Sequence, residues 1–243
     1  MTCSRAAQAS VMKKISVAFL TALAVSSQAS VFTVHANVSV WVQTPVITNK
    51  FGFAVFPASK DQHMDHLGQA DSTGLSNPTA ITFGGNHSLD ANGWANSDPV
   101  MNSIATADAS SAQKFNLGNL TGDIGPAEVL HVKLGYSYNW SVDLSTATDE
   151  SAAGTISLNL AGTQLVIEAF AINGNDFVSQ GGTGSGTVDV DLNPNSVTSK
   201  FFNGSVTGNA TSPMSPAPVP EPASLTAVAA GLIALVRRRT KAA

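Results

Sequence analysis

The chain has 243 residues, a formal net charge of −4 at pH 7 and a single cysteine, Cys3. Between residues 30 and 218 it has five lysines, fifteen acidic residues and no arginine, so this segment has a net charge near −10. Such a segment is a poor ligand for nucleic acid, because contacts with phosphates need basic side chains. Disulfides, a thiol nucleophile and cysteine metal ligands are excluded from the same segment, because Cys3 lies outside it.

The N-terminal region has the pattern of a secretory signal peptide. Two lysines precede an apolar run over residues 15–25, and small residues follow up to Ala29. This run is too short to span a hydrocarbon core of about 30 Å. We therefore predict a cleaved leader over residues 1–29, for which Met12 is an alternative start. Cleavage is expected after Ala29, and the small residues up to Ala36 give an alternative site.

Alternation of apolar and polar residues predicts β-strands, most clearly from Val129 to Leu144. The even-numbered positions of this run are all apolar or aromatic, whereas most odd-numbered positions are polar. We therefore expect Tyr138 and Trp140 to face the core and Asn139 to face solvent. A single strand of this length would be unusual, so Gly135 is predicted to mark a bulge or a bend.

Shorter alternating runs predict strands at residues 38–42, 156–160 and 188–192, and the last of these has Asp189 and Asp191 on its solvent face. The uniformly apolar run from Leu165 to Ile172 predicts a central strand that is covered on both faces. Further candidate strands lie at residues 51–56, 79–83, 114–117 and 197–202.

Turn-forming residues separate these runs, notably at residues 173–176 and 181–186. A short helix is expected after Asp98, which would be its N-cap, with Pro99 at the first helical position. Eight or nine short strands joined by polar turns indicate an all-β fold, an antiparallel β-sandwich or jelly roll. We assign it to one domain over residues 30–210.

A polar cluster over residues 61–66 is the first candidate for chemistry. It resembles the His-x-His-x-Asp-His zinc motif of metallo-β-lactamase-type hydrolases, with aspartate in place of the first histidine. Imidazole and carboxylate groups at this spacing can converge on one metal ion, with His87 and His131 as further ligands. That family also needs alternating strands and helices, which this sequence does not predict, and a hydrated polar loop explains the same residues. The candidate metal ligands are Asp61, His63, Asp65 and His66.

Calcium is a second candidate ligand, at two oxygen-rich segments. Residues 189–195 have oxygen-bearing side chains at the first, third and fifth positions of a calcium loop. However, Pro194 stands where such a loop needs glycine, and an alternating strand that enters a turn explains the segment. A looser oxygen-rich group around Trp94 consists of Asp90, Asn92, Asn96 and Asp98.

The three tryptophans are candidates for stacking on sugar rings, as aromatic platforms do in carbohydrate-binding modules. Trp94 is the preferred candidate, because it is predicted to lie in a polar loop. Trp140 is discounted because it lies on the predicted core face, and Trp41 is the third member of the set. An aromatic side chain that covers the edge of the sandwich is the alternative explanation for Trp94.

The C-terminal region has three parts. Prolines concentrate near residues 211–218, which predicts an extended stalk. A sorting tail follows over residues 219–243, in which a short tetrapeptide precedes an uncharged apolar segment at 223–236 and a basic end at 237–241. This order resembles the PEP-CTERM sorting signal that exosortases of Gram-negative bacteria recognise, and the resemblance is confined to the tail. The sorting motif would be Val219, Pro220, Glu221 and Pro222, and the topology signal Arg237, Arg238 and Arg239.

The apolar segment predicts a marginal membrane anchor. Fourteen helical residues extend about 21 Å, against about 30 Å of hydrocarbon. The arginines should stay cytoplasmic, which leaves the preceding body outside the inner membrane. The resemblance implies that an exosortase then cuts near Glu221 and releases or transfers the body outward. It also makes extracellular polysaccharide a candidate partner, because such proteins are often encoded beside polysaccharide systems.

The sequence shows no phosphate-binding loop and no nucleophile elbow, so we predict no enzymatic activity and no cofactor. The leading hypothesis is an exosortase-sorted protein of the cell surface or biofilm matrix, with a non-catalytic structural or adhesive role. A calcium-assisted carbohydrate-binding module is the alternative. A metallohydrolase centred on His63, Asp65 and His66 is the third hypothesis. The expected partners are an exosortase, the inner membrane and extracellular polysaccharide, but not nucleic acid.

Overall fold

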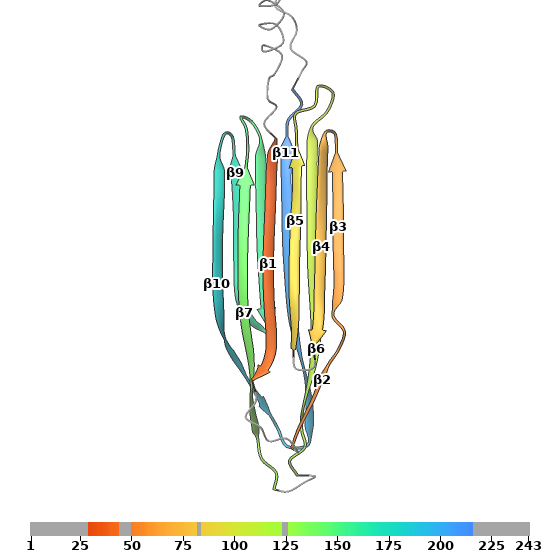
Figure 1. Ribbon diagram of the computed structural model, residues 1–243, viewed down its shortest axis with the longest axis vertical. Coiled ribbons are helices and arrows are strands. Elements are labelled where there is room, and N and C mark those ends of the chain that lie inside the picture. The colour runs from red at the N-terminus through yellow and green to blue at the C-terminus, as the bar shows by residue number, and fades with distance from the viewer. Residues whose placement is uncertain (1–28, 44–49, 82–83, 123–125, 216–243) are drawn as a thin grey trace, which may run out of the picture.

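The computed structural model describes residues 29–43, 50–81, 84–122 and 126–215, and Figure 1 shows them as two layers of long strands. All regular elements within these ranges are β-strands. Residues 1–28 of the predicted leader and the predicted sorting tail lie outside the described residues.

Eleven strands follow one another along the described chain. They are β1 (Ser30–Gln43), β2 (Phe51–Val55), β3 (Ser59–Leu67), β4 (Ala70–Ile81), β5 (Gly84–Ala95), β6 (Ser103–Asn119), β7 (Leu130–Ser145), β8 (Ser151–Leu160), β9 (Thr163–Asn173), β10 (Phe177–Leu192) and β11 (Ser196–Ser212). Five of them form sheet A, in the order β10-β7-β1-β5-β4. Sheet B has the order β2-β6-β11-β8-β9, and β3 also pairs with β6. Every pair is antiparallel, which confirms the predicted antiparallel sandwich.

The two sheets enclose an apolar core, to which the strands contribute alternate residues. Phe32 of β1 is fully buried between the sheets. Two glycines make room for its ring, Gly93 on β5 and Gly208 on β11, because a Cβ atom at either position would collide with it. The other largest buried side chains are Phe115, Phe202, Leu89, Leu117, Leu134, Leu144, Ile156, Leu158, Leu160, Leu192 and His87.

The alternating runs form strands with the predicted faces. In β7 the even-numbered residues face inward, and Tyr138 and Trp140 are half-buried there while Asn139 is exposed. In β10 Val190 and Leu192 are buried, whereas Asp189 and Asp191 are exposed. The predicted strands near residues 51, 114 and 197 also exist, although the last two are parts of much longer strands.

Two glycine-based predictions are wrong for one physical reason. Gly135 forms no bulge, because β7 runs unbroken through it with continuous register on both sides. The glycine-rich run 181–186 is not a turn but the middle of β10. In both places an aromatic ring from the neighbouring strand covers the glycine, and such cover replaces the missing side chain.

Three further predictions are wrong. The run from Leu165 to Ile172 is not a central strand, because β9 ends the order of sheet B and Ile167 is 62% exposed. No helix follows Asp98, although its Oδ1 accepts hydrogen bonds from the next backbone N–H groups at 2.8 and 3.3 Å. Strand β6 begins at Ser103, which leaves too few residues to nucleate a helix. Residues 61–66 form part of strand β3 rather than a loop.

The first and last strands are fastened together at one end of the sandwich. Figure 1 shows the start of β1 and the end of β11 at the same end. Ser30 donates a hydrogen bond to the carbonyl of Ser151, whose hydroxyl lies 2.5 Å from that of Thr211. Ser212 donates to the buried carboxylate of Glu150 at 2.8 Å. Strand β11 therefore continues two residues beyond 210, into the segment assigned to the stalk.

Candidate functional site

Neutral polar side chains fill the middle of the outer face of sheet A. Its strands pair in register, so side chains from all five strands line up in rows across the sheet. Two adjacent rows contain only serine, threonine and asparagine, and every member is exposed or half-buried. The rows are Thr183, Asn139, Asn37, Ser88 and Asn77, followed by Ser185, Ser137, Ser39, Asn86 and Thr79. We call these ten residues the polar rows.

Trp41 borders the polar rows at one end. It follows Ser39 by two residues on β1 and therefore points to the same face. Gly135 and Gly84 stand beside it on the neighbouring strands. The indole lies over Gly135, because a Cβ atom there would be 2.8 Å from Trp41 Cζ2. With 37% of its surface exposed, Trp41 presents an aromatic surface level with the hydroxyl and amide groups.

Trp94 lies on the same outer face toward the other end of sheet A, in β5 rather than in a loop. It is 39% exposed and pairs with Val31 of β1 and Asp71 of β4. Ten residues of β1 separate the row of Trp94 from Trp41, which corresponds to about 33 Å at 3.3 Å per residue.

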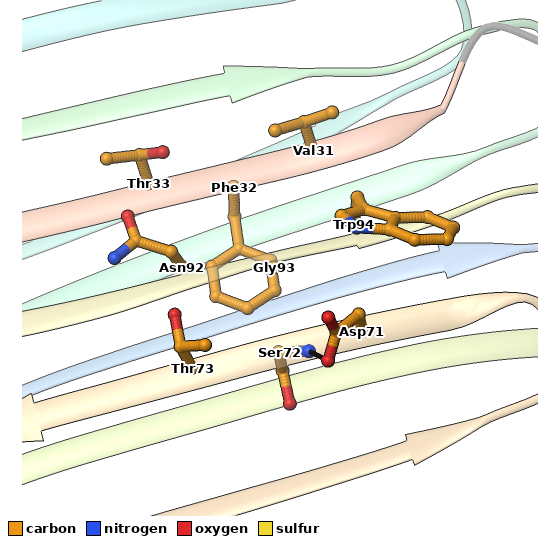
Figure 2. Close-up of a pocket in the computed structure, with 9 residues that line it drawn as sticks. All are labelled: Val31, Phe32, Thr33, Asp71, Ser72, Thr73, Asn92, Gly93 and Trp94. Carbon is orange, nitrogen blue, oxygen red and sulfur yellow. Dashed lines mark hydrogen bonds between the residues drawn. The ribbon is translucent and has the colours of Figure 1, made fainter.

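A shallow depression lies beside Trp94, as Figure 2 shows. Asp71, Asn92 and the threonines of the next row, Thr33 and Thr73, bring oxygen and amide groups to it. The Oδ1 atom of Asp71 accepts a hydrogen bond from the N–H of the next residue at 2.8 Å, which orients the carboxylate. The depression thus combines an aromatic ring with hydrogen-bond donors and acceptors.

A hydrogen-bonded chain lies between the depression and the polar rows. The Nδ1 atom of His35 lies 2.5 Å from Asp90 Oδ1, and its Nε2 lies 2.9 Å from the amide nitrogen of Asn37. The amide donates, so Nε2 accepts and Nδ1–H donates to the carboxylate. Ser88 donates to the other oxygen of Asp90 at 3.4 Å. These bonds fix the orientation of side chains that would otherwise have several rotamers.

The four candidate metal ligands all lie on β3 and are exposed. Alternation along a strand places Asp61, His63 and Asp65 on one face and His66 on the other. Among the described residues, no group of three or more histidine, cysteine or acidic side chains could hold a metal ion. The zinc hypothesis thus stays an untested prediction, without a preformed cluster to support it.

The two further histidines are occupied elsewhere. His87 is buried between the sheets, where its ring nitrogens lie 2.7 Å from Ser111 Oγ and 3.0 Å from Gln113 Oε1. Burial lowers the pKa of His87 to about 4, and the hydrogen bond with Gln113 opposes that shift. His131 lies on the exposed face of β7, 2.6 Å from Asp191.

The calcium candidates also have partners within the chain. Asp189 faces Lys133 at 3.3 Å, and Asp191 faces His131. These contacts join β10 to β7, so both carboxylates already have a partner on the neighbouring strand. Calcium binding remains a prediction that only a measurement tests.

Sequence reasoning missed the polar rows, because they form only when five strands pair in register. Each strand contributes two of their ten members, and no single segment stands out. The sequence favours Trp94 over Trp41 as a sugar-stacking candidate, although both lie on this face. The signal that could have indicated them is a strand pattern whose outward-facing residues are serine, threonine or asparagine rather than charged residues.

Comparison with known protein families identifies the tail. Residues 218–239 match the family model for the PEP-CTERM protein-sorting motif. The match includes the predicted tetrapeptide and the three arginines, and it marks the chain for export and exosortase-mediated processing at the membrane. No curated protein matches the chain. Within the described ranges no helix is long and apolar enough to cross a membrane, and the predicted helix at 223–236 lies outside them.

Proposed function

We propose that this protein is a non-catalytic adhesive component of the cell surface or extracellular matrix, which binds polysaccharide through the outer face of sheet A. The carrying observation is the pair of polar rows bordered by Trp41. Hydroxyl and amide groups both donate and accept hydrogen bonds, as sugar hydroxyls do, and an exposed indole offers an apolar surface for a sugar ring. A flat face some 33 Å long between the rows of the two tryptophans suits an extended polymer rather than a small molecule.

The arrangement of the ends supports sorting of an intact body. Cleavage after Ala36 would remove the first half of the central strand β1, including the buried Phe32 and Val34. Cleavage after Ala29 leaves that strand whole. Because β11 ends beside the start of β1, the stalk and the sorting tail follow from that same end. Trp41 and the polar rows then lie farther from the anchored end than Trp94.

Binding is tested with polysaccharide isolated from the producing cells. We expect electrophoresis of the purified protein in gels that contain the polymer to show retarded migration. A charge-neutral substitution in the polar rows, Asn37→Leu, should reduce the retardation, whereas Asn203→Leu on the outer face of sheet B should not. Equal migration of all proteins with and without polymer would contradict adhesion. Retardation that disappears with a chelator would instead favour the calcium-assisted module.

Sorting is tested separately, by fractionating cells and determining the mass of the released C-terminus. Glu221→Ala or Pro222→Ala should leave export intact but block release, so that uncut protein accumulates in the inner membrane. The prolines on either side of Glu221 keep the backbone extended, in the form that a protease binds. Release at the same site from a host that lacks its exosortase would contradict the sorting step.

A further inference from the structure

Strand β10 has one free backbone edge along its whole length. It pairs with β7 from Phe177 to Leu192, and it ends the order of sheet A. No strand among the described residues pairs with its other side. A free edge of 16 residues presents a row of backbone donors and acceptors to which another chain can pair.

The other edges of the sandwich carry features that discourage pairing. Strand β4 contains Pro78. Strand β3 lies beside β4, and Gln62 of β3 donates a hydrogen bond to the carbonyl of Ser76 of β4. Strand β9 has Glu168 and a register shift opposite its first residues. In contrast, residues 177–188 of β10 contain no charge, no proline and no register shift. Edge strands are normally protected by such features, so their absence in β10 is informative.

Aromatic rings of β7 cover the glycines of this edge strand. The rings of Trp140, Tyr138 and Tyr136 cover the inner side of the three glycines directly opposite them, at positions 182, 184 and 186. The two tyrosine rings are stacked, with centroids 6.2 Å apart, and Trp140 contacts Phe170 of sheet B. The glycines therefore remain in an ordered strand, and its free side has no bulky side chain over the 181–187 segment.

The sequence of β10 is partly symmetric about Thr183. From Val178 to Val188 it reads Val-Ser-Gln-Gly-Gly-Thr-Gly-Ser-Gly-Thr-Val. If a second copy pairs antiparallel about a two-fold axis at Thr183, Val178 lies opposite Val188 and Ser179 opposite Thr187. Gly182 lies opposite Gly184 and Thr183 opposite Thr183 at the centre, whereas Gly181 faces Ser185 and Gln180 faces Gly186. Pairs of these types are compatible on both faces of an antiparallel ladder.

We propose that two copies of this chain join through β10, with the strands antiparallel and Thr183 at the two-fold axis. Charge favours this orientation over the parallel one. Antiparallel pairing places Asp189 opposite Phe177 of the second copy, whereas parallel in-register pairing would place like carboxylates side by side. A two-fold interface uses the same surface on both copies, as a self-complementary strand requires. The two A sheets then form one ten-stranded sheet, and the polar row that contains Thr183 continues across the junction.

Disulfide trapping tests the register in the full-length chain, with Cys3→Ser so that each introduced cysteine is the only thiol. Facing residues of an antiparallel pair lie about 4.5–5.5 Å apart between Cα atoms, within the range that a disulfide spans. Under mild oxidation, Thr183→Cys should give mostly the doubled mass on non-reducing gels. Thr73→Cys, exposed on the same face of the protected edge strand β4, should remain monomeric.

Further variants distinguish this register from any other contact. Ser179→Cys and Thr187→Cys should each fail to cross-link alone but should cross-link when the two chains are co-expressed. Thr183→Lys should lower the particle mass in light scattering to that of one chain, whereas Thr73→Lys should leave it at two. Cross-linking of Ser179→Cys alone would show a parallel pair and overturn the proposal. A single-chain mass for the unsubstituted protein at all concentrations would also overturn it.

Discussion

The two faces of sheet A are built from the same strands but have opposite chemistry. On β1 the inward residues Phe32, Val34 and Val38 are at most 2% exposed. The alternate residues Thr33, His35 and Asn37 are polar and face outward. The inner face packs against sheet B through large apolar side chains. The outer face contains the polar rows, which make hydrogen bonds available without a charge. Neighbouring positions thus differ in role, one in stability and the next in the polysaccharide binding that we propose.

The largest predicted loss of stability is for the buried Phe32, on the inner face of sheet A. Phe32→Ala should lower the free energy of unfolding by about 4 kcal/mol, because the ring fills the space between Gly93 and Gly208 and leaves a cavity. Thr33→Ala, one residue along the same strand, should change it by less than about 0.5 kcal/mol. Urea unfolding followed by circular dichroism measures both values. Similar losses at the two positions would contradict the assignment of faces.

Acid should weaken the inner face through His87. Its folded pKa of about 4 lies below the unfolded value of 6.5, so the neutral ring stabilises the fold above pH 6.5. That contribution falls as the pH drops from 6.5 toward 4, by about 2 to 3 kcal/mol at pH 4.5. The measurement is the free energy of unfolding at pH 7.5 and at pH 4.5.

The matched control for this acid effect is His87→Gln, which keeps a polar side chain but does not titrate. All other side chains are the same in both proteins, so the difference between the two pH dependences reports His87. We expect the variant to be less stable at pH 7.5 but to lose less stability on acidification. Equal pH dependence in the two proteins would exclude His87 as the cause.

A smaller effect is expected at the side of the core near β10. Trp140→Ala should lower the free energy of unfolding by about 2 kcal/mol, less than for a fully buried ring, because the indole is half-buried against Phe170 and Gly182. Asn139→Ala, the adjacent exposed residue, should have an effect below about 0.5 kcal/mol. Thermal unfolding of the pair checks the difference, and equal shifts in melting temperature would mean that the indole does not pack inward.

Alternation made the inner face predictable from sequence. Val132, Val142 and Leu144 in β7, like Ile156 and Leu158 in β8, recur at every second position, and only a strand buries such a pattern on one face. The glycine-rich segment of β10 was not predictable in this way. Its strand conformation depends on rings that β7 supplies from about 45 residues earlier in the chain, and turn propensity is a local property.

The outer face could be predicted only in part. Each strand shows that its outward residues are polar, but their assembly into rows depends on strand order, which alternation does not determine. The sequence favours Trp94 because it predicts a polar loop there, whereas Trp94 lies on strand β5. The tail was the most predictable part, because its motif, apolar segment and arginines are contiguous and are read as a linear signal.

Calorimetric titration with oligosaccharides from the native polysaccharide tests the central claim, that the outer face of sheet A is the adhesive surface. The decisive pair is Trp41→Ala and Phe201→Ala, two exposed aromatics on the outer faces of sheets A and B. We predict that Trp41→Ala weakens binding at least tenfold, about 1.4 kcal/mol, while Phe201→Ala leaves the affinity unchanged. Unchanged affinity in Trp41→Ala, or an equal loss in both variants, would contradict the claim.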